Sequence, residues 1–147
     1  MPDRFRGAIV LPPVVLFCSL LHASPAAAQP LYVQAASGND HYNTAFASAS
    51  FAGSVSAGNA IAVLCAWTSA SQTLTSVTDT QGNAYTIVDN PTSGTYGRAA
   101  MAYAIAGASG GDTVRCGFSS SSMGKSIVVH EIAGINATTP LDGHRMS

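Results

Sequence analysis

Hydrophobic and polar residues alternate with a period of two along most of the chain after residue 29, and turn-forming residues interrupt the alternation at intervals. This pattern is typical of β-strands with one buried face, whereas none of these segments holds the sustained 3.6-residue apolar stripe of an amphipathic helix. Eight short strands are predicted: Leu31–Ala35, Phe46–Phe51, Ala60–Thr68, Thr73–Thr78, Ala84–Asp89, Gly97–Ala106, Thr113–Phe118 and Lys125–Ala133. The predicted fold class is therefore all-β, an antiparallel two-sheet β-sandwich.

Side-chain size indicates which face of three strands points into the core. The larger residues of each strand share one face, and the alternating alanines leave room for a second layer to approach. These larger residues are Ile61, Val63, Cys65 and Trp67, then Met101, Tyr103 and Ile105, and finally Val114, Cys116 and Phe118. We therefore assign Trp67 and Tyr103 to core faces and expect Arg115 to point to water.

The connections carry turn chemistry. The segment Asp79–Asn83 is predicted to be a hairpin loop, because Gly82 and Asn83 can take a positive φ. Segments 107–111 and 119–124 have a similar composition, so a meander is expected from Thr73 to Ala133. Segments 39–43 and 91–96 look like longer loops, which is where sandwiches usually place binding residues.

The N-terminus looks like an export signal. Two arginines precede an apolar run that ends in small residues, and a cleavage site is predicted before Gln29. The run is too short to span a bilayer, and two prolines interrupt it. We therefore divide the chain into a secretory signal peptide, residues 1–28, and a single domain, residues 29–147, that is secreted and has no membrane span.

Charge and cysteine content agree with export. From Gln29 onward the chain has four basic and six acidic residues, a formal balance of −2, which is too near neutral to favour nucleic acid. Cys18 is lost with the predicted signal, which leaves Cys65 and Cys116. Both point to the core in the predicted strands, and we expect them to form a disulfide in an oxidising compartment.

Several motifs together resemble a module of secreted bacterial proteins, often found in long multidomain surface chains. They are the turn Ser56–Asn59, the apolar strand ending in Trp67, the V-T-D-x-x-G-N-x-Y segment Val77–Tyr85, the segment Gly110–Val114, and the E-x-x-G of Glu131–Gly134 followed by Pro140–Asp142. The resemblance covers about Ser48 to Gly143 and implies an Ig-like or jelly-roll-like extracellular sandwich without established catalytic residues. In such modules the chain runs on past Pro-Leu-Asp, so the resemblance also implies that C-terminal strands are missing beyond Ser147.

Two motifs with catalytic precedents are interpreted as chance matches. Ser109 lies in a G-x-S-x-G pattern, but a nucleophile elbow needs a following helix and here a strand follows. Ser122 and Lys125 match S-x-x-K, which also needs a helix to bring the two side chains together. No catalytic residue is predicted, and the chain is interpreted as not an enzyme.

Metal and sugar sites are the remaining candidates. Asp79, Asn83 and Asp89 flank one predicted loop and offer oxygen ligands to Ca²⁺, although Asx-turn hydrogen bonding explains the same residues. No other cofactor is predicted. The histidines His41, His130 and His144 are too scattered for a zinc site. Adjacent His130 and Glu131 should point to opposite faces of their strand, one to solvent and the other to backbone donors.

The favoured function is a non-catalytic extracellular module with a structural, spacer or adhesion role at the bacterial cell surface. The partners expected are cell-surface glycans or proteins. The alternative is a carbohydrate-binding module, with or without calcium, that uses the loop residues Tyr42 and Tyr96 as its ligand-binding side chains. A secreted hydrolase is a distant third.

Overall fold

The computed structural model describes residues 29–91 and 97–143, and these form strands and loops without a helix. Residues 1–28, the predicted signal peptide, lie outside the described residues, as do Tyr96 and His144. All eight predicted strands are present. Their bounds are β1 Leu31–Asp40, β2 Thr44–Ser50, β3 Ala60–Trp67, β4 Leu74–Asp79, β5 Thr86–Asp89, β6 Arg98–Ile105, β7 Thr113–Ser122 and β8 Lys125–Ala133.

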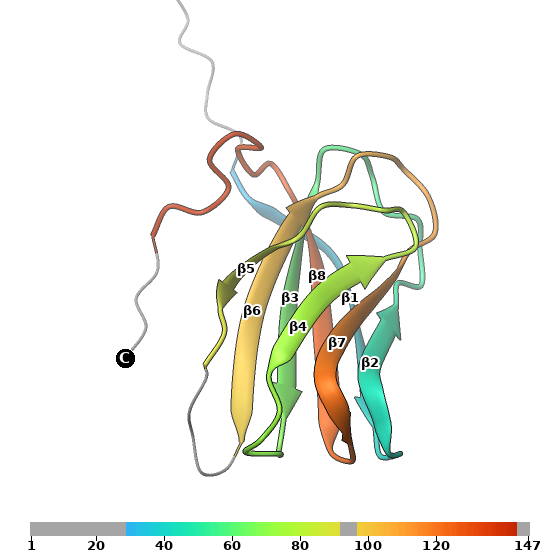
Figure 1. The fold of residues 1–147 in the computed structure, drawn as a ribbon. Helices are drawn as coiled ribbons and strands as arrows, with labels where there is room; N and C mark the ends of the chain where they lie inside the picture. Colours follow the sequence, from blue (N-terminus) through green and yellow to red (C-terminus); the bar gives the residue numbers. More distant parts are fainter. Residues whose placement is uncertain (1–28, 92–96, 144–147) are drawn as a thin grey trace, which may run out of the picture.

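The strands form two antiparallel sheets that pack face to face (Figure 1). One sheet has five strands in the order β1-β8-β3-β6-β5, and the other has three in the order β2-β7-β4. The predicted all-β two-sheet sandwich is therefore confirmed. Most paired strands, such as β1 and β8, are far apart in sequence. The fold is therefore held together mainly by contacts between residues distant along the chain.

The register of the five-stranded sheet defines two ends of the sandwich. Leu31 pairs with Ala133 at one end of β1 and β8, and Asp40 pairs with Lys125 at the other. We call the first end the terminal pole, because β1 begins and β8 ends there; it also holds the connections 51–59, 80–85 and 106–112. The opposite end, the loop pole, holds the connections 41–43, 68–73 and 123–124, together with the end of β5 and the start of β6 (Figure 1).

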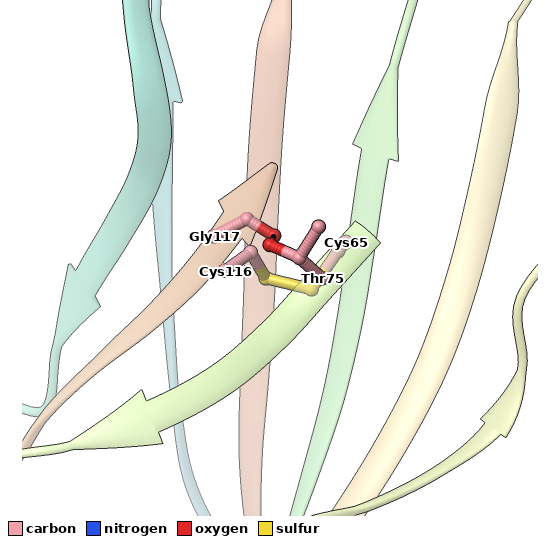
Figure 2. The surroundings of a disulfide bond; sticks show 4 residues. All are labelled: Cys65, Thr75, Cys116 and Gly117. Atoms are coloured by element: carbon pink, nitrogen blue, oxygen red, sulfur yellow. Dashed lines mark hydrogen bonds between the residues drawn. A yellow bond between two sulfur atoms is a disulfide. The ribbon is translucent and has the colours of Figure 1, made fainter. Parts of the chain in front are cut away.

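Inward side chains of both sheets form one core. On β3 the predicted face of Ile61, Val63, Cys65 and Trp67 is buried, and Trp67 meets Phe118 of β7 edge to face with ring centroids 5.3 Å apart. Burying aliphatic side chains of this size contributes about 1.5–3 kcal/mol each. The predicted Cys65–Cys116 disulfide is confirmed and links the two sheets across the core (Figure 2). Beside it, the Thr75 hydroxyl donates to the Gly117 carbonyl oxygen at 3.0 Å.

Two expectations about the sheets are wrong. The segment from Thr73 to Ala133 is not a meander, because β4 and β7 lie in one sheet while β5, β6 and β8 lie in the other. The connections predicted as hairpins, 79–83, 107–111 and 119–124, therefore cross between the sheets. Tyr103 does not face the core, nor do Met101 and Ile105 on the same face of β6. The buried Ala100, Ala102 and Ala104 face it instead, because their small side chains fit against the large inward residues of the neighbouring strands.

Strands β1 and β7 extend beyond the predicted limits. In β1 the polar residues after Ala35 continue to pair with β8 as far as Asp40. Gly38 is required there, since a Cβ atom at this position would lie 1.9 Å from the Ser48 carbonyl oxygen of β2. In β7 the serines after Phe118 belong to the strand, and its last residue, Ser122, pairs with Thr44.

Candidate functional site

The connections at the loop pole surround an open pocket of about 480 Å³. Small residues form its floor at the ends of four strands of the larger sheet, and polar side chains surround them. The lining comprises Asn39, His41, Ala66, Trp67, Thr68, Gly97, Arg98, Ala99, Gly124, Lys125 and Ser126. Two of the lining residues, Arg98 and Lys125, carry charged side chains that are buried.

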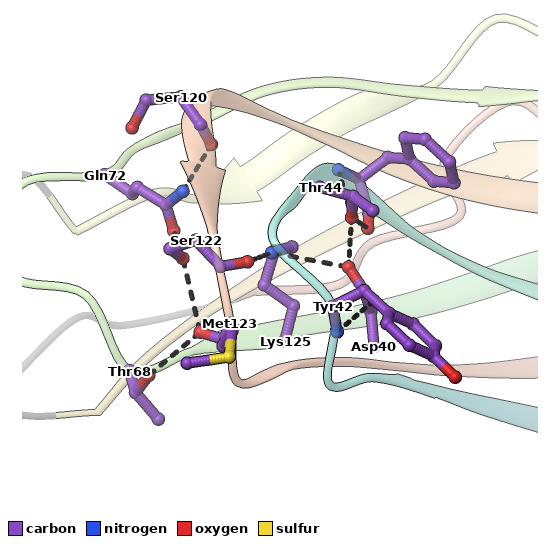
Figure 3. A network of polar contacts seen from close by, with 10 residues as sticks. Asp40, Tyr42, Thr44, Thr68, Gln72, Ser120, Ser122, Met123 and Lys125 are labelled. Atoms are coloured by element: carbon purple, nitrogen blue, oxygen red, sulfur yellow. Dashed lines mark hydrogen bonds and ion pairs between the residues drawn. The ribbon is translucent and has the colours of Figure 1, made fainter.

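Lys125 anchors the connection between β1 and β2. Its ammonium nitrogen, fully buried, lies 3.4 Å from Asp40 Oδ2 and also donates to the Ser122 carbonyl oxygen (Figure 3). Asp40 accepts further hydrogen bonds from the Thr44 hydroxyl and, at 2.9 Å, from the Tyr42 N–H. The Thr44 hydroxyl, the Tyr42 N–H and Lys125 together hold the pKa of Asp40 below its ordinary value, against the effect of burial. The connection 41–43 is therefore held in place at its start by the ion pair of Lys125 and Asp40.

Gln72 and Arg98 anchor the connection between β3 and β4. Gln72 is fully buried, donates to the Ser120 carbonyl oxygen and accepts from the Ser122 hydroxyl at 2.7 Å (Figure 3). The main-chain carbonyl oxygen of Gln72 accepts hydrogen bonds from Trp67 Nε1 at 3.1 Å and from the Arg98 guanidinium at 2.8 Å. The connection 68–73 is thus held to the end of β7 and to the core by buried side chains that bond to backbone carbonyl oxygens and to the Ser122 hydroxyl.

The aromatic residue predicted for this loop is displayed rather than packed. Tyr42 has 79% of its surface exposed, while the backbone that carries it is tied to Asp40. An exposed ring on a fixed backbone is suited to stacking against a flat apolar surface such as a pyranose ring, because little loop entropy is lost on binding. His41, beside it, lines the pocket. Tyr96, the second predicted ligand residue, lies outside the described residues.

At the terminal pole, Asp79 and Asn83 are brought together as the sequence predicts, by an Asx-type set of hydrogen bonds. Asp79 accepts from the Asn83 N–H at 3.0 Å, from its side-chain amide at 2.7 Å and from the Tyr85 hydroxyl at 2.9 Å. Burial opposes ionisation of Asp79, but these bonds outweigh it and lower the pKa. Burial and the Asp79 carboxylate raise the pKa of Tyr85.

Asp89, the third residue of the predicted calcium site, is at the end of β5. It lines a second, apolar pocket of about 340 Å³ between the outer face of the larger sheet and the segment after β8, together with residues such as Met101 and Leu141. Asp112 instead is the acid beside Asp79. Within residues 29–91 and 97–143, no three His, Cys, Asp or Glu side chains gather as metal ligands.

Glu131 holds the terminal pole together. It is fully buried, and it accepts from the Ser56 N–H at 2.8 Å and from the side-chain amides of Asn59 and Gln34, both at 2.6 Å. Burial opposes ionisation, but these three donors hold the pKa of Glu131 below its ordinary value. The neighbouring His130 is exposed, so the predicted opposite orientation of the two is confirmed.

The serines of the two motifs with catalytic precedents make hydrogen bonds that hold the structure together. Ser109 is exposed between β6 and β7, and its hydroxyl accepts from the Ala57 N–H at 2.9 Å. Lys125 does reach Ser122, but it contacts the carbonyl oxygen, while the Ser122 hydroxyl donates to Gln72. Neither serine hydroxyl forms a hydrogen bond with a His, Asp, Glu or Lys side chain in the described part of the chain.

Sequence reasoning missed the buried polar residues Gln72, Arg98 and Lys125. A signal existed for one of them, since Lys125 is the single lysine of the chain and shares its strand phase with Ile127, Val129 and Glu131. Charged residues in the inward phase of a strand are rarely tolerated without partners. The phase therefore indicates a buried, paired lysine, although not its partner.

Comparison with known proteins adds no relative: no family model, curated protein or solved structure matches the chain. The described residues also contain no helix of the length and apolarity that crossing a membrane requires.

Proposed function

We propose that the chain is a non-catalytic extracellular module with an adhesion role at the bacterial cell surface, and that it binds its partner with the loop pole. One observation carries this proposal: the pairing of Leu31 with Ala133 places the start of β1 and the end of β8 at the same pole. Chain that precedes β1 therefore leaves the sandwich at the terminal pole, and chain that follows β8 departs from the same pole before it passes over the outer face of the larger sheet. The opposite pole is left to face outward.

The same observation argues against a spacer role. A spacer in a string of modules transmits tension between opposite ends. Here tension applied at Leu31 and Ala133 separates the pair at one end of the β1–β8 ladder and then opens the ladder residue by residue. An arrangement of this kind is poor for bearing load and suited to displaying loops.

The disulfide supports an extracellular location, because such bonds persist in oxidising compartments. The export signal at residues 1–28 remains a prediction that agrees with it. The absence of a catalytic role is supported by the use of the charged side chains near the pockets: Lys125, Asp40 and Glu131 each hold loop backbone or one another.

Carbohydrate binding is the second candidate, and the exposed ring of Tyr42 beside the pocket favours it. In this alternative the adhesion partner is a glycan, and Tyr96 is expected to supply a second ring. Calcium bound near Asp79 and Asn83 would act from the terminal pole, so it would stabilise the module rather than contact the sugar. A secreted hydrolase remains the third and least supported function.

A glycan array, accompanied by an array of surface proteins, tests the proposal. Residues 29–147 should bind one class of surface molecule, and Tyr42→Ala should weaken that binding by about tenfold, the loss expected for one aromatic contact. Tyr32→Ala is the matched control, since Tyr32 is also exposed but lies at the terminal pole. Loss of binding in EDTA would indicate a calcium requirement. Silence on both arrays would contradict the adhesion role and leave a structural one.

A further inference from the structure

Two acids meet at the terminal pole, one from each of two connections that link the sheets. Asp79 ends β4 and Asp112 precedes β7; Asp112 is hydrogen-bonded to Thr80, the residue next to Asp79, and the two carboxyl groups interact. Asp112 is only 4% exposed. Two carboxylates in contact repel each other strongly when both are ionised and one is buried.

The hydrogen bonds of the pair leave one oxygen without a donor. Asp112 Oδ1 accepts from the Thr80 hydroxyl at 2.9 Å and from the Thr80 N–H at 3.2 Å. Asp112 Oδ2 is buried and has no hydrogen-bond donor among the described residues. Asp79 already accepts from Asn83 and Tyr85. A proton on Asp112 Oδ2 would turn this unsatisfied acceptor into a donor toward Asp79.

The other titratable and charged groups around the pair do not replace that proton. The Tyr85 hydroxyl donates to Asp79, so it favours the ionised form of Asp79 and not of Asp112. Arg115 on β7 lines a small pocket with Asp79, but its guanidinium lies over the Phe46 ring, 4.2 Å from the centroid, and makes no ion pair with either acid in the described structure.

We propose that Asp79 and Asp112 share one proton and that this proton holds the connections 80–85 and 106–112 together as a latch. The acids are surrounded by contacts between these two connections: Gln81 donates to the Gly111 carbonyl oxygen at 2.7 Å, and the Gly107 N–H donates to the Asn83 side chain at 2.8 Å. Loss of the proton leaves two adjacent negative charges, which push the connections apart and weaken those contacts.

The direction of the pH dependence follows from Asp112. Burial and the neighbouring Asp79 charge raise its pKa, although the Thr80 hydrogen bonds oppose the rise. A group whose pKa is raised on folding stabilises the fold fully below its unfolded pKa, near 4. That stabilisation is lost as the pH rises through the raised value. The latch is therefore closed in mild acid and opens toward alkaline pH.

Amide hydrogen exchange between about pH 4 and about pH 8 tests the latch. In the wild type, the protection factors of the Gly107 and Thr80 amides should fall on the order of tenfold as the pH rises, after correction for intrinsic exchange. Asp112→Asn should keep both amides protected across the range, because its amide donates to Asp79 at every pH. Asp142→Asn, an exposed acid on the segment after β8, is the matched control and should behave as the wild type.

The carboxyl carbon shifts of the wild type keep the proposal testable if Asp112→Asn does not fold. Asp112 should titrate above the ordinary aspartate value, near 4, in a carbon-detected NMR titration. A midpoint at that ordinary value, or protection factors that do not change with pH in the wild type, would overturn the proposal. A rise in melting temperature with added CaCl₂ that disappears in Asp112→Asn would overturn it too, since the acids would then share a cation.

Discussion

The two poles of the sandwich bury charges of opposite sign. The buried charged residues of the loop pole are Lys125 and Arg98, whereas those of the terminal pole are Glu131 and Asp112. The cations donate to loop carbonyl oxygens, such as those of Ser122 and Gln72. The acids accept from loop N–H groups, such as those of Ser56 and Thr80.

The difference shows how a chain with few charged residues uses them to bind the backbone of its connections. Each of these buried side chains forms at least one hydrogen bond with the backbone of a connection, and a hydrogen bond to a charged group is worth more than one to a neutral group. At the terminal pole the acids are largely surrounded by such donors. At the loop pole the pair formed by Lys125 and Asp40 reaches the surface, and Tyr42 stands exposed beside it.

The largest effect is expected when the terminal pole loses Glu131. Glu131→Ala removes the acceptor of three donors at once, from Ser56, Asn59 and Gln34. At about 1.5–3 kcal/mol for each hydrogen bond to a charge, and with incomplete additivity, the free energy of unfolding should fall by about 4 kcal/mol. Urea denaturation of the variant and the wild type measures the difference.

Neighbouring substitutions show whether that loss belongs to the carboxylate. Glu131→Gln keeps one acceptor oxygen and should lose about half as much, because its amide group faces the Gln34 amide as a second donor. His130→Ala, on the exposed side of the same strand, should change the free energy of unfolding by less than about 0.5 kcal/mol. A loss in His130→Ala as large as in Glu131→Ala would show that the strand, and not the carboxylate, is responsible.

The disulfide lies between the poles, so its removal should affect both equally. The paired cysteines are 51 residues apart, and closing a loop of this length contributes roughly 3–4 kcal/mol in the chain-entropy model. The double variant Cys65→Ala, Cys116→Ala should lose about this much in urea denaturation. Thiol titration of the unfolded, unreduced wild type should find neither Cys65 nor Cys116 free. Two reactive thiols there would contradict the bond.

The smallest effect is expected at the loop pole. Lys125→Met replaces the ammonium group with an apolar chain of similar length, and Asp40 keeps its hydrogen bonds from Thr44 and Tyr42. Because Asp40 is partly exposed to water, its carboxylate is not left buried without a partner. The loss of stability should therefore be less than half of that in Glu131→Ala. Urea denaturation of the two variants side by side makes the comparison. A larger loss in Lys125→Met would reverse the proposed difference between the poles.

The sequence predicted the strands well because alternation and turn residues are local signals. It did not predict the partners of the strands: a loop such as Asp79–Asn83 has the same composition whether it turns within a sheet or crosses to the other. It also misplaced Tyr103, because size alone does not show which face is buried when a neighbouring strand already fills the core with residues such as Trp67.

The candidate site was less accessible to prediction than the fold. The phases of Cys65 and Cys116 were enough to anticipate the bond between them. The partnership of Asp79 with Asp112 was not predictable, since 33 positions separate them and only the packing of two connections brings them together. Buried polar contacts of this kind depend on tertiary structure and leave little trace in local sequence.

Blocking each pole in turn tests most directly whether the loop pole is the binding end. A bulky biotin–streptavidin group is attached through Ser71→Cys, exposed at the loop pole, or through Ala57→Cys, exposed at the terminal pole. Binding to the surface molecules found on the arrays is then measured for both. The block at residue 71 should abolish binding and the block at residue 57 should leave it unchanged. Binding that survives the block at residue 71 and is lost with the block at residue 57 would contradict the account.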